Sequence, residues 1–122
     1  MKYLAKLLCL FAVFASIPTT VSAGTLETIK GRGVLNCGVS QGLAGFSIAE
    51  DKGNWTGFDV DFCRAIAAAI FNDPTKIKFF PLSADERFSA LRSGSIDVLS
   101  RNSTWTLSRE NPMGLKIGRA HV

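Results

Sequence analysis

The stretch KIKFFPLSADERFSALRSGSIDVLS, Lys76–Ser100, predicts a strand, a helix and a second strand in direct succession. Residues 76–82 are rich in the aromatic and branched side chains that favour strands. Ser83 and Glu86 have the spacing of a capping box, in which each side chain accepts a hydrogen bond from the other residue's backbone at a helix start. After a glycine that ends this helix, apolar residues predict a strand at 96–100. This order predicts two parallel strands joined by a helical crossover.

The residues before this stretch add one more strand and one more helix. VLNCGVS, residues 34–40, is β-rich and predicts the first strand. DVDFCRAIAAAIF, residues 59–71, has apolar residues at helical spacing, and we expect Asp59 or Asp61 to cap its start. DKGNWTG, residues 51–57, predicts the tip of a hairpin. The expected buried face of the helix consists of Phe62, Ile66, Ala69 and Ile70.

The whole order, strand–helix–strand–helix–strand, predicts an α/β fold with a parallel sheet, right-handed crossovers and helices that cover the sheet. In such a sheet, ligands bind beyond the carboxyl ends of the strands, where the strand order reverses. If the second and third strands flank the first, the loops QGLAGFS, residues 41–47, and RNSTWTLS, residues 101–108, meet at such a point. We therefore expect a ligand-binding site between these two loops.

The loop that leaves the third strand has the chemistry to bind a carboxylate. Arg109 offers a planar fork that can pair with a carboxylate through two hydrogen bonds. Thr104 and Asn102 add hydroxyl and amide donors. Arg87, on the first turn of the second helix, is expected to face the same region, and the alternative for both arginines is an ordinary solvated surface charge. Phe46 either contacts a ligand or belongs to the core.

MKYLAKLLCLFAVFASIPTTVSA, residues 1–23, has the form of a secretory signal peptide. Lys2 and Lys6 precede an apolar run, and small residues end the segment. The alternative, a membrane anchor, is disfavoured because the apolar run is too short to span a bilayer. Without these two lysines the formal net charge falls from +4 to +2, which does not indicate a nucleic-acid partner.

The sequence contains three cysteines, of which Cys9 falls in the expected signal peptide. Cys37 and Cys63 remain, and such an even pair in an exported protein can form a disulfide. The alternative is that both are small buried hydrophobic residues. His121 is the only histidine and the cysteine spacing does not match a zinc site, so we expect no metal and no cofactor.

Two segments, GFDVDFCRAIA and DVLSRNSTWTLSR, resemble the solute-binding protein family 3, and in particular the general L-amino-acid binding proteins of ABC importers. The resemblance extends from Thr25 to about Leu115. It implies a type II periplasmic-binding-protein-like fold, whose two lobes close around one amino acid. Residues 24–115 would be the β-α-β-α-β part of lobe one, without the second lobe. The implied role is binding rather than catalysis, in the periplasm of a Gram-negative bacterium, with the membrane permease of an ABC importer as partner.

The resemblance also implies roles for individual residues. Arg109 matches the arginine that holds the α-carboxylate of the ligand, and Thr104 matches a residue whose hydroxyl and backbone N–H bind the same group. Arg87 matches an arginine that members with acidic ligands use for the side chain. Phe46 matches an aromatic residue of the family, whereas Leu43 stands where many relatives place an aromatic ring against the ligand. The expected ligand-binding set is Arg109, Thr104, Asn102, Arg87, Arg101, Phe46 and Leu43.

The carboxyl-terminal tail departs from the family. Residues 117–122, IGRAHV, resemble nothing in it, and codons of a common sequencing adapter would encode them. We therefore expect residues 116–122 to be an adapter artefact at the end of a fragment. The alternative is a genuine short homologue with a novel tail.

The alternative function is an exported enzyme on the same fold, such as a dehydratase or the regulatory domain of a cell-wall lyase. Neither polar loop contains a carboxylate or histidine before Glu110, which disfavours general acid–base catalysis there.

Overall fold

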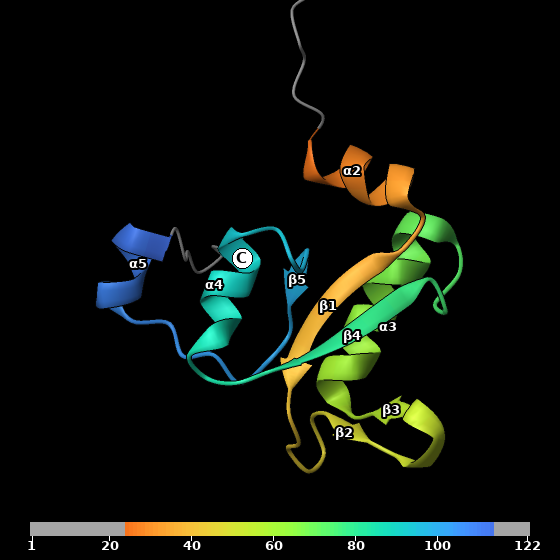
Figure 1. The fold of residues 1–122 in the computed structure, drawn as a ribbon, viewed down its shortest axis with the longest axis horizontal. Helices are drawn as coiled ribbons and strands as arrows, with labels where there is room; N and C mark the ends of the chain where they lie inside the picture. Colours follow the sequence, from red (N-terminus) through yellow and green to blue (C-terminus); the bar gives the residue numbers. More distant parts are fainter. Residues whose placement is uncertain (1–23, 114–122) are drawn as a thin grey trace, which may run out of the picture.

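The computed structural model describes residues 24–113, which form a parallel sheet with helices on both faces (Figure 1). The elements in chain order are α2 (Thr25–Arg32), β1 (Leu35–Ser40), β2 (Ile48–Ala49), the 3-10 helix η2 (Asp51–Gly53), β3 (Trp55–Thr56), α3 (Phe58–Phe71), β4 (Ile77–Leu82), α4 (Glu86–Arg92), β5 (Val98–Leu99) and α5 (Leu107–Met113). The expected signal peptide, residues 1–23, and the tail, residues 116–122, lie outside the described part. Within residues 24–113, no helix is long and apolar enough to cross a membrane.

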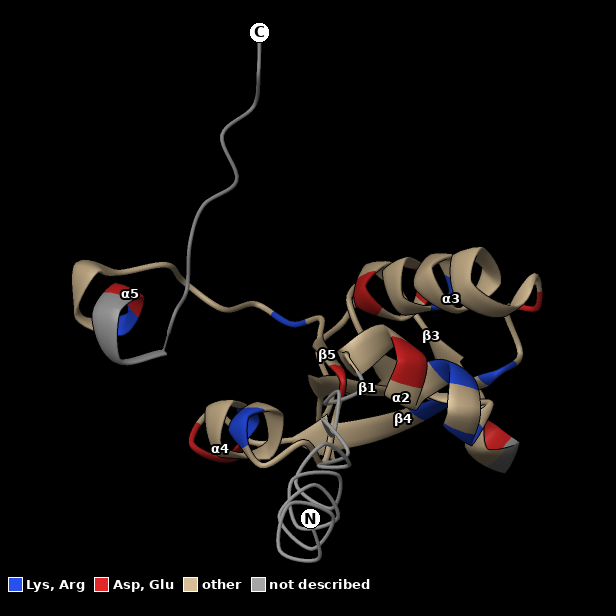
Figure 2. Cartoon of the chain, turned by 90° about the horizontal axis from the view of Figure 1, so that it is seen from above, with Lys and Arg blue, Asp and Glu red and all other residues tan. Residues whose placement is uncertain are grey.

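The main sheet has the strand order β4-β1-β5, and both strand pairs are parallel. The first strand along the chain therefore lies in the centre, so the condition under which the two polar loops meet is fulfilled. The connection from β1 to β4 runs in one direction along the sheet, and the connection from β4 to β5 runs back past β1. Because both connections are crossovers of the same hand, α3 and α4 lie on opposite faces of the sheet (Figure 2). A separate antiparallel pair, β2 and β3, forms the predicted hairpin.

The core forms between β1 and α3. Leu35, Cys37 and Val39 alternate along β1 and are fully buried. They pack with Cys63 and Ala67 of α3 in two neighbouring clusters. This alternation places every second side chain of β1 on the α3 face, as the pleat of a strand requires.

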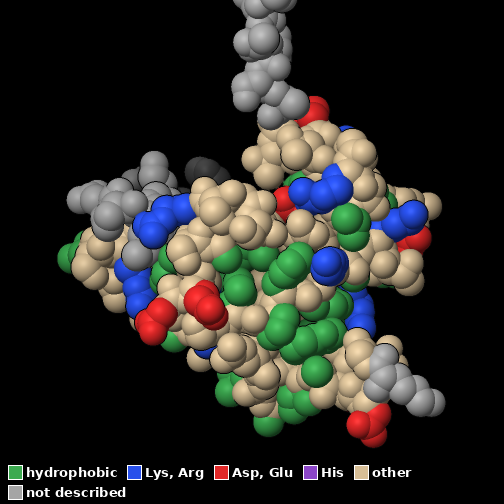
Figure 3. Space-filling view, viewed as in Figure 1, with side chains coloured by type: hydrophobic (Ala, Val, Ile, Leu, Met, Phe, Trp, Pro, Cys, Tyr) green, Lys and Arg blue, Asp and Glu red, His purple; other side chains and the backbone are tan. Residues whose placement is uncertain are grey.

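The opposite face of β1 carries a glycine against which apolar side chains pack closely. A Cβ atom built on Gly38 would lie 2.6 Å from Ile96 Cδ1 and 2.9 Å from Leu82 Cδ1. A larger side chain at this position would therefore have to displace the ends of these two side chains. Figure 3 shows further hydrophobic side chains gathered on the face that Figure 1 presents, over β4 and toward the hairpin.

The predicted buried face of α3 is wrong in part. Ile66 and Ile70 pack against the core, but Phe62 is 52% exposed and Ala69 is exposed. The helix is turned so that the residue facing Cys37 of β1 is a cysteine and not a phenylalanine. The buried side chains of α3 are those of Asp59, Val60, Cys63 and Ala67.

The start of α3 also differs from the prediction, because neither Asp59 nor Asp61 caps the helix. The N-cap residue is Gly57, at φ 120°, and no side chain caps the helix. A Cβ atom on Gly57 would lie 2.4 Å from the carbonyl carbon and oxygen of Phe46. Only a glycine fits where the loop after β1 crosses the helix start this closely.

The capping box before α4 is confirmed. The backbone N–H of Ser83 donates to Glu86 Oε2 at 3.0 Å, and the N–H of Glu86 donates to Ser83 Oγ at 3.3 Å. The helix is followed by Gly94 at φ 74°, in agreement with the predicted end. The third strand is shorter than predicted, with only Val98–Leu99 in place of residues 96–100.

Candidate functional site

Two loops meet at the carboxyl edge of the sheet. Residues 41–47 follow β1, and residues 100–106 follow its neighbour β5. The first loop is a tight turn, in which the backbone N–H and carbonyl of Leu43 both bond to Ser47, at 2.8 and 2.9 Å. The strand order therefore brings the predicted loops together at the expected switch point.

Phe46 lies at the surface of the first loop rather than in the core. Its side chain is 44% exposed, and its ring meets the edge of Phe58 with 6.5 Å between ring centroids. Leu43 is half-buried in the same turn. These two side chains form the apolar part of the candidate site.

Arg87 is buried at the start of α4, with 8% of its surface exposed. Its Nη1 donates to the carbonyl of Asn102 and to the hydroxyl of Ser103, each at 3.3 Å. Burial lowers the pKa of the Arg87 guanidinium, and the charges of Arg101 and Arg109 lower it further. This arginine is therefore not the solvated surface charge that the sequence left open, since it joins α4 to the segment after β5.

Arg109 lies in the first turn of α5 and folds back on its own loop. Its Nη1 donates to the carbonyl of Thr104 at 2.8 Å. The guanidinium groups of Arg109 and Arg87 both lie over the ring of Phe88, at 5.2 and 4.9 Å from its centroid. One buried ring thus gathers two positive groups from separate helices, through cation–π attraction.

Arg101 connects the ends of two strands. Its Nη1 donates to the carbonyl of Leu82, at the end of β4, and its Nε donates to Asn102 Oδ1 at 3.2 Å. Asn102 itself is exposed. In this structure the Arg101 side chain therefore orients the segment after β5.

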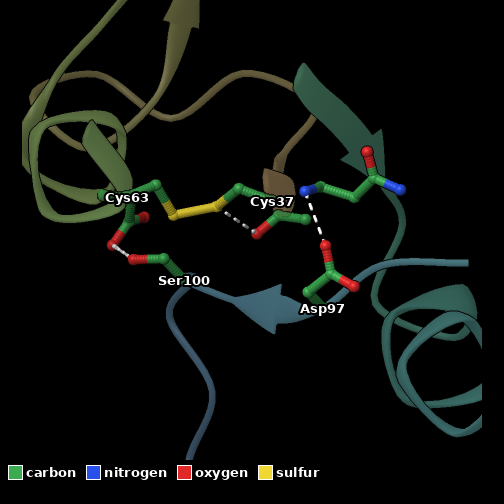
Figure 4. The surroundings of a disulfide bond; sticks show 7 residues. Cys37, Cys63, Asp97 and Ser100 are labelled. Atoms are coloured by element: carbon green, nitrogen blue, oxygen red, sulfur yellow. Dashed lines mark hydrogen bonds between the residues drawn. A yellow bond between two sulfur atoms is a disulfide. The ribbon is translucent and has the colours of Figure 1, made fainter. Parts of the chain in front are cut away.

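A buried polar cluster beneath the two loops escaped the sequence analysis. Ser47 Oγ donates to the carbonyl of Ser40 at 3.3 Å. Ser100 Oγ donates to Asp59 Oδ1 at 3.4 Å, the bond drawn at Ser100 in Figure 4. Burial raises the pKa of the Asp59 carboxyl, while the Ser100 bond and the Arg101 charge lower it. The signal that could have found this cluster is the serine that ends each of two apolar strands.

The same region contains a disulfide between Cys37 of β1 and Cys63 of α3 (Figure 4). The two Cα atoms are 6.3 Å apart, within the range that a disulfide requires. The bond joins the central strand to the helix that carries Asp59. Metal-ligating side chains do not gather in groups of three or more anywhere in residues 24–113.

The comparisons with known proteins agree on one family. The family profile described as bacterial extracellular solute-binding proteins, family 3, matches residues 35–116. The general L-amino acid-binding periplasmic protein AapJ of Rhizobium johnstonii is 54% identical over 103 residues, which cover 84% of this chain and 30% of that protein. An ABC transporter periplasmic binding protein from Brucella ovis, solved with glutathione bound, is 60% identical, with a TM-score of 0.74 over 76% of this chain and 29% of that one. The chain thus spans about a third of the length of the curated relatives it matches.

Two other solved structures bear on what such a chain can do. Domain 1 of TmArgBP, in its arginine-bound form, is 30% identical, with a TM-score of 0.61 over 70% of this chain and 64% of that one. An ancestral cyclohexadienyl dehydratase is 28% identical, with a TM-score of 0.63 over 74% of this chain and 36% of that one. The fold is therefore shared by binding proteins and by an enzyme lineage.

Proposed function

The chain belongs to the bacterial extracellular solute-binding proteins, family 3, and we propose that it is the first lobe of an amino-acid receptor that serves an ABC importer. The observation that supports this most is the pair of guanidinium groups over Phe88, beside the carboxyl edge of the sheet. All L-amino acids share an α-carboxylate, and arginine forks suit that group. The periplasm is the proposed location, because the curated relatives are named as periplasmic proteins.

Each predicted residue has a role in this proposal. Arg109 pairs with the α-carboxylate, and the hydroxyl and backbone N–H of Thr104 donate to the same group. Arg87 attracts a second carboxylate, so that acidic ligands gain more than neutral ones. Phe46 and Leu43 contact the apolar part of the ligand. Asn102 and Arg101 shape the polar side of the site, and the permease subunits of the importer receive the closed receptor.

The alternative is an enzyme on the same fold, because an ancestral cyclohexadienyl dehydratase has a similar structure. Dehydration needs a general acid or base within reach of the substrate. The loops at 41–47 and 101–108 contain no carboxylate and no histidine, and the nearby Asp59 is buried beneath them. These observations, with relatives named as binding proteins, favour binding.

Calorimetry and thermal-shift measurements on the purified chain test the proposal, with L-glutamate, L-alanine, L-arginine and glutathione as probes. The probes are used at millimolar concentration, because one lobe supplies only half of a ligand's shell and weak binding is expected. Arg109→Ala should remove the response to every probe, because all carry an α-carboxylate. The matched control is Arg92→Ala, which removes an exposed arginine from the last turn of α4. Equal responses from both variants, or release of a chemically altered probe, would contradict the proposal.

A further inference from the structure

One residue of α3 contacts both loops of the candidate site. The backbone N–H of Asp59 donates to the carbonyl of Phe46 at 2.9 Å. The carboxylate of Asp59 accepts a hydrogen bond from Ser100, whose own N–H donates to Gly38 of β1 at 3.0 Å. Asp59 thus lies where the loop after β1 and the segment after β5 come together.

The local fold does not require a carboxylate at this position. The N-cap of α3 is Gly57, and Asp59 does not cap the helix. Only 6% of Asp59 is exposed, and its Oδ2 has no hydrogen-bond partner among the described residues. A buried carboxylate with an unsatisfied oxygen normally costs stability. We therefore relate the carboxylate of Asp59 to the groups that it contacts rather than to the stability of the helix.

The charged surroundings of Asp59 point to the segment after β5. Arg101 is the charged group whose field acts on Asp59. The other charged residues near the start of α3, Asp61 and Arg64, pair with each other at the surface. The loop after β1, residues 41–47, contains no titratable side chain, and β1 contributes only the bonded Cys37.

We propose that Asp59 is a positioning residue, which fixes the segment after β5 against the loop after β1. It acts through Ser100 and Arg101, and so sets where Thr104 and Arg109 lie relative to Phe46. Its importance for ligand binding rests on the proposed function, but the positioning itself is measurable without a ligand.

Amide hydrogen exchange by NMR on the purified chain tests the positioning. The reporters are the N–H of Ser100, which donates to β1, and the N–H of Ser47, which donates to Leu43. The reference is the N–H of Leu35, which donates to the carbonyl of Lys76 away from the site. Dividing by the reference rate removes any general loss of stability.

Two substitutions at Asp59 separate its hydrogen bond from its charge. Asp59→Ala should raise the Ser100 exchange rate at least about tenfold relative to Leu35, because a hydrogen bond to a charged group is lost. The Ser47 rate should rise less, because the backbone N–H of residue 59 still donates to Phe46 in this variant. Asp59→Asn keeps an acceptor for Ser100 and loses the attraction to Arg101, so the rise should be only a few-fold. The matched control, Asp61→Ala, lies on the same helix turn but faces solvent, and should change neither reporter.

A pH series adds a second measurement, since the normalised Ser100 exchange rate should depend on the charge of Asp59 only if that charge positions the segment after β5. As the Asp59 carboxyl takes up a proton, the normalised Ser100 rate should rise to the level of the Asp59→Asn protein, and that variant should show no such step. A uniform rise at all three amides in Asp59→Ala, or no rise, would overturn the proposal. If L-glutamate fails to bind the unmodified protein even at millimolar concentration while the exchange pattern holds, the proposed function fails and the positioning stands.

Discussion

Replacing Gly57 by alanine should damage both the fold and the first loop of the site. Gly57 has φ 120° and ψ 171°, a backbone region that only glycine adopts readily. Forcing another residue into such a conformation costs about 1–3 kcal/mol. The new Cβ would also lie 2.4 Å from two backbone atoms of Phe46, and the shift that relieves this overpacking costs about 1–3 kcal/mol more. Gly57→Ala should therefore cost about 2–6 kcal/mol, a large part of the roughly 5–15 kcal/mol that stabilises a typical domain.

Gly53→Ala is the matched control. Gly53 also has a positive φ, of 80°, but no atom lies within 4 Å of its added Cβ. It should therefore cost only the strain of a left-handed residue, about 1–2 kcal/mol. Urea unfolding followed by tryptophan fluorescence measures both variants, since Trp55 lies on β3 next to this turn. If Gly57→Ala loses no more stability than Gly53→Ala, the close approach to Phe46 does not constrain the protein and the reasoning fails.

The remaining predictions concern the ligand, the disulfide and pH. In a full-length protein whose second lobe closes over the ligand, Arg109→Ala should weaken the binding of every amino acid by roughly a hundredfold or more, since removing one partner of a buried charge pair costs ~3–5 kcal/mol. Arg109→Lys should recover only part of this loss. In calorimetry on that protein, Arg87→Ala should weaken the binding of acidic ligands most, and an equal loss for neutral ligands would refute its selective role. The isolated chain should bind L-amino acids only weakly, because half of a ligand's shell is missing, and micromolar affinity in calorimetry would contradict this. Mass measurement with and without reductant should show a bond between Cys37 and Cys63, and its reduction should cost about 3.5 kcal/mol for a separation of 26 residues. Since the pKa of Asp59 is raised in the folded state, ionisation opposes folding, so Asp59→Asn should be the more stable protein at neutral pH and lose this advantage as the pH falls through that pKa.

The sequence predicted well those features that depend on neighbours along the chain. The capping box of Ser83 and Glu86 needs only four residues, and its two hydrogen bonds are present. The parallel pairing of the strands also followed from sequence, because a strand–helix–strand unit has few ways to fold back on a sheet. The capping box and the parallel pairing of the strands were enough to place the loops of the site at one edge of the sheet.

Features that depend on contacts between distant parts of the chain could not be predicted from the sequence. In α3 almost every position is apolar or small, so spacing alone could not show that Val60 and not Phe62 faces the sheet. Arg87 was expected near the site, but its burial involves the segment after β5, whose Asn102 lies 15 residues further along the chain. Asp59 was interpreted as a helix cap because acidic residues at a helix start usually have that role.

The described part of the chain leaves two buried side-chain atoms without a partner, Asp59 Oδ2 and Arg87 Nε. Both belong to residues that contact the segment after β5, beside the proposed site. Natural proteins rarely leave such groups unsatisfied, and the exceptions concentrate where function opposes stability. Arg87 carries a further cost, because the charges of Arg101 and Arg109 disfavour its charged form. A carboxylate ligand at this edge would offset that repulsion, and a ligand that binds only the folded state stabilises it in proportion to its occupancy. The repulsion among Arg87, Arg101 and Arg109 is therefore what a negatively charged ligand would relieve.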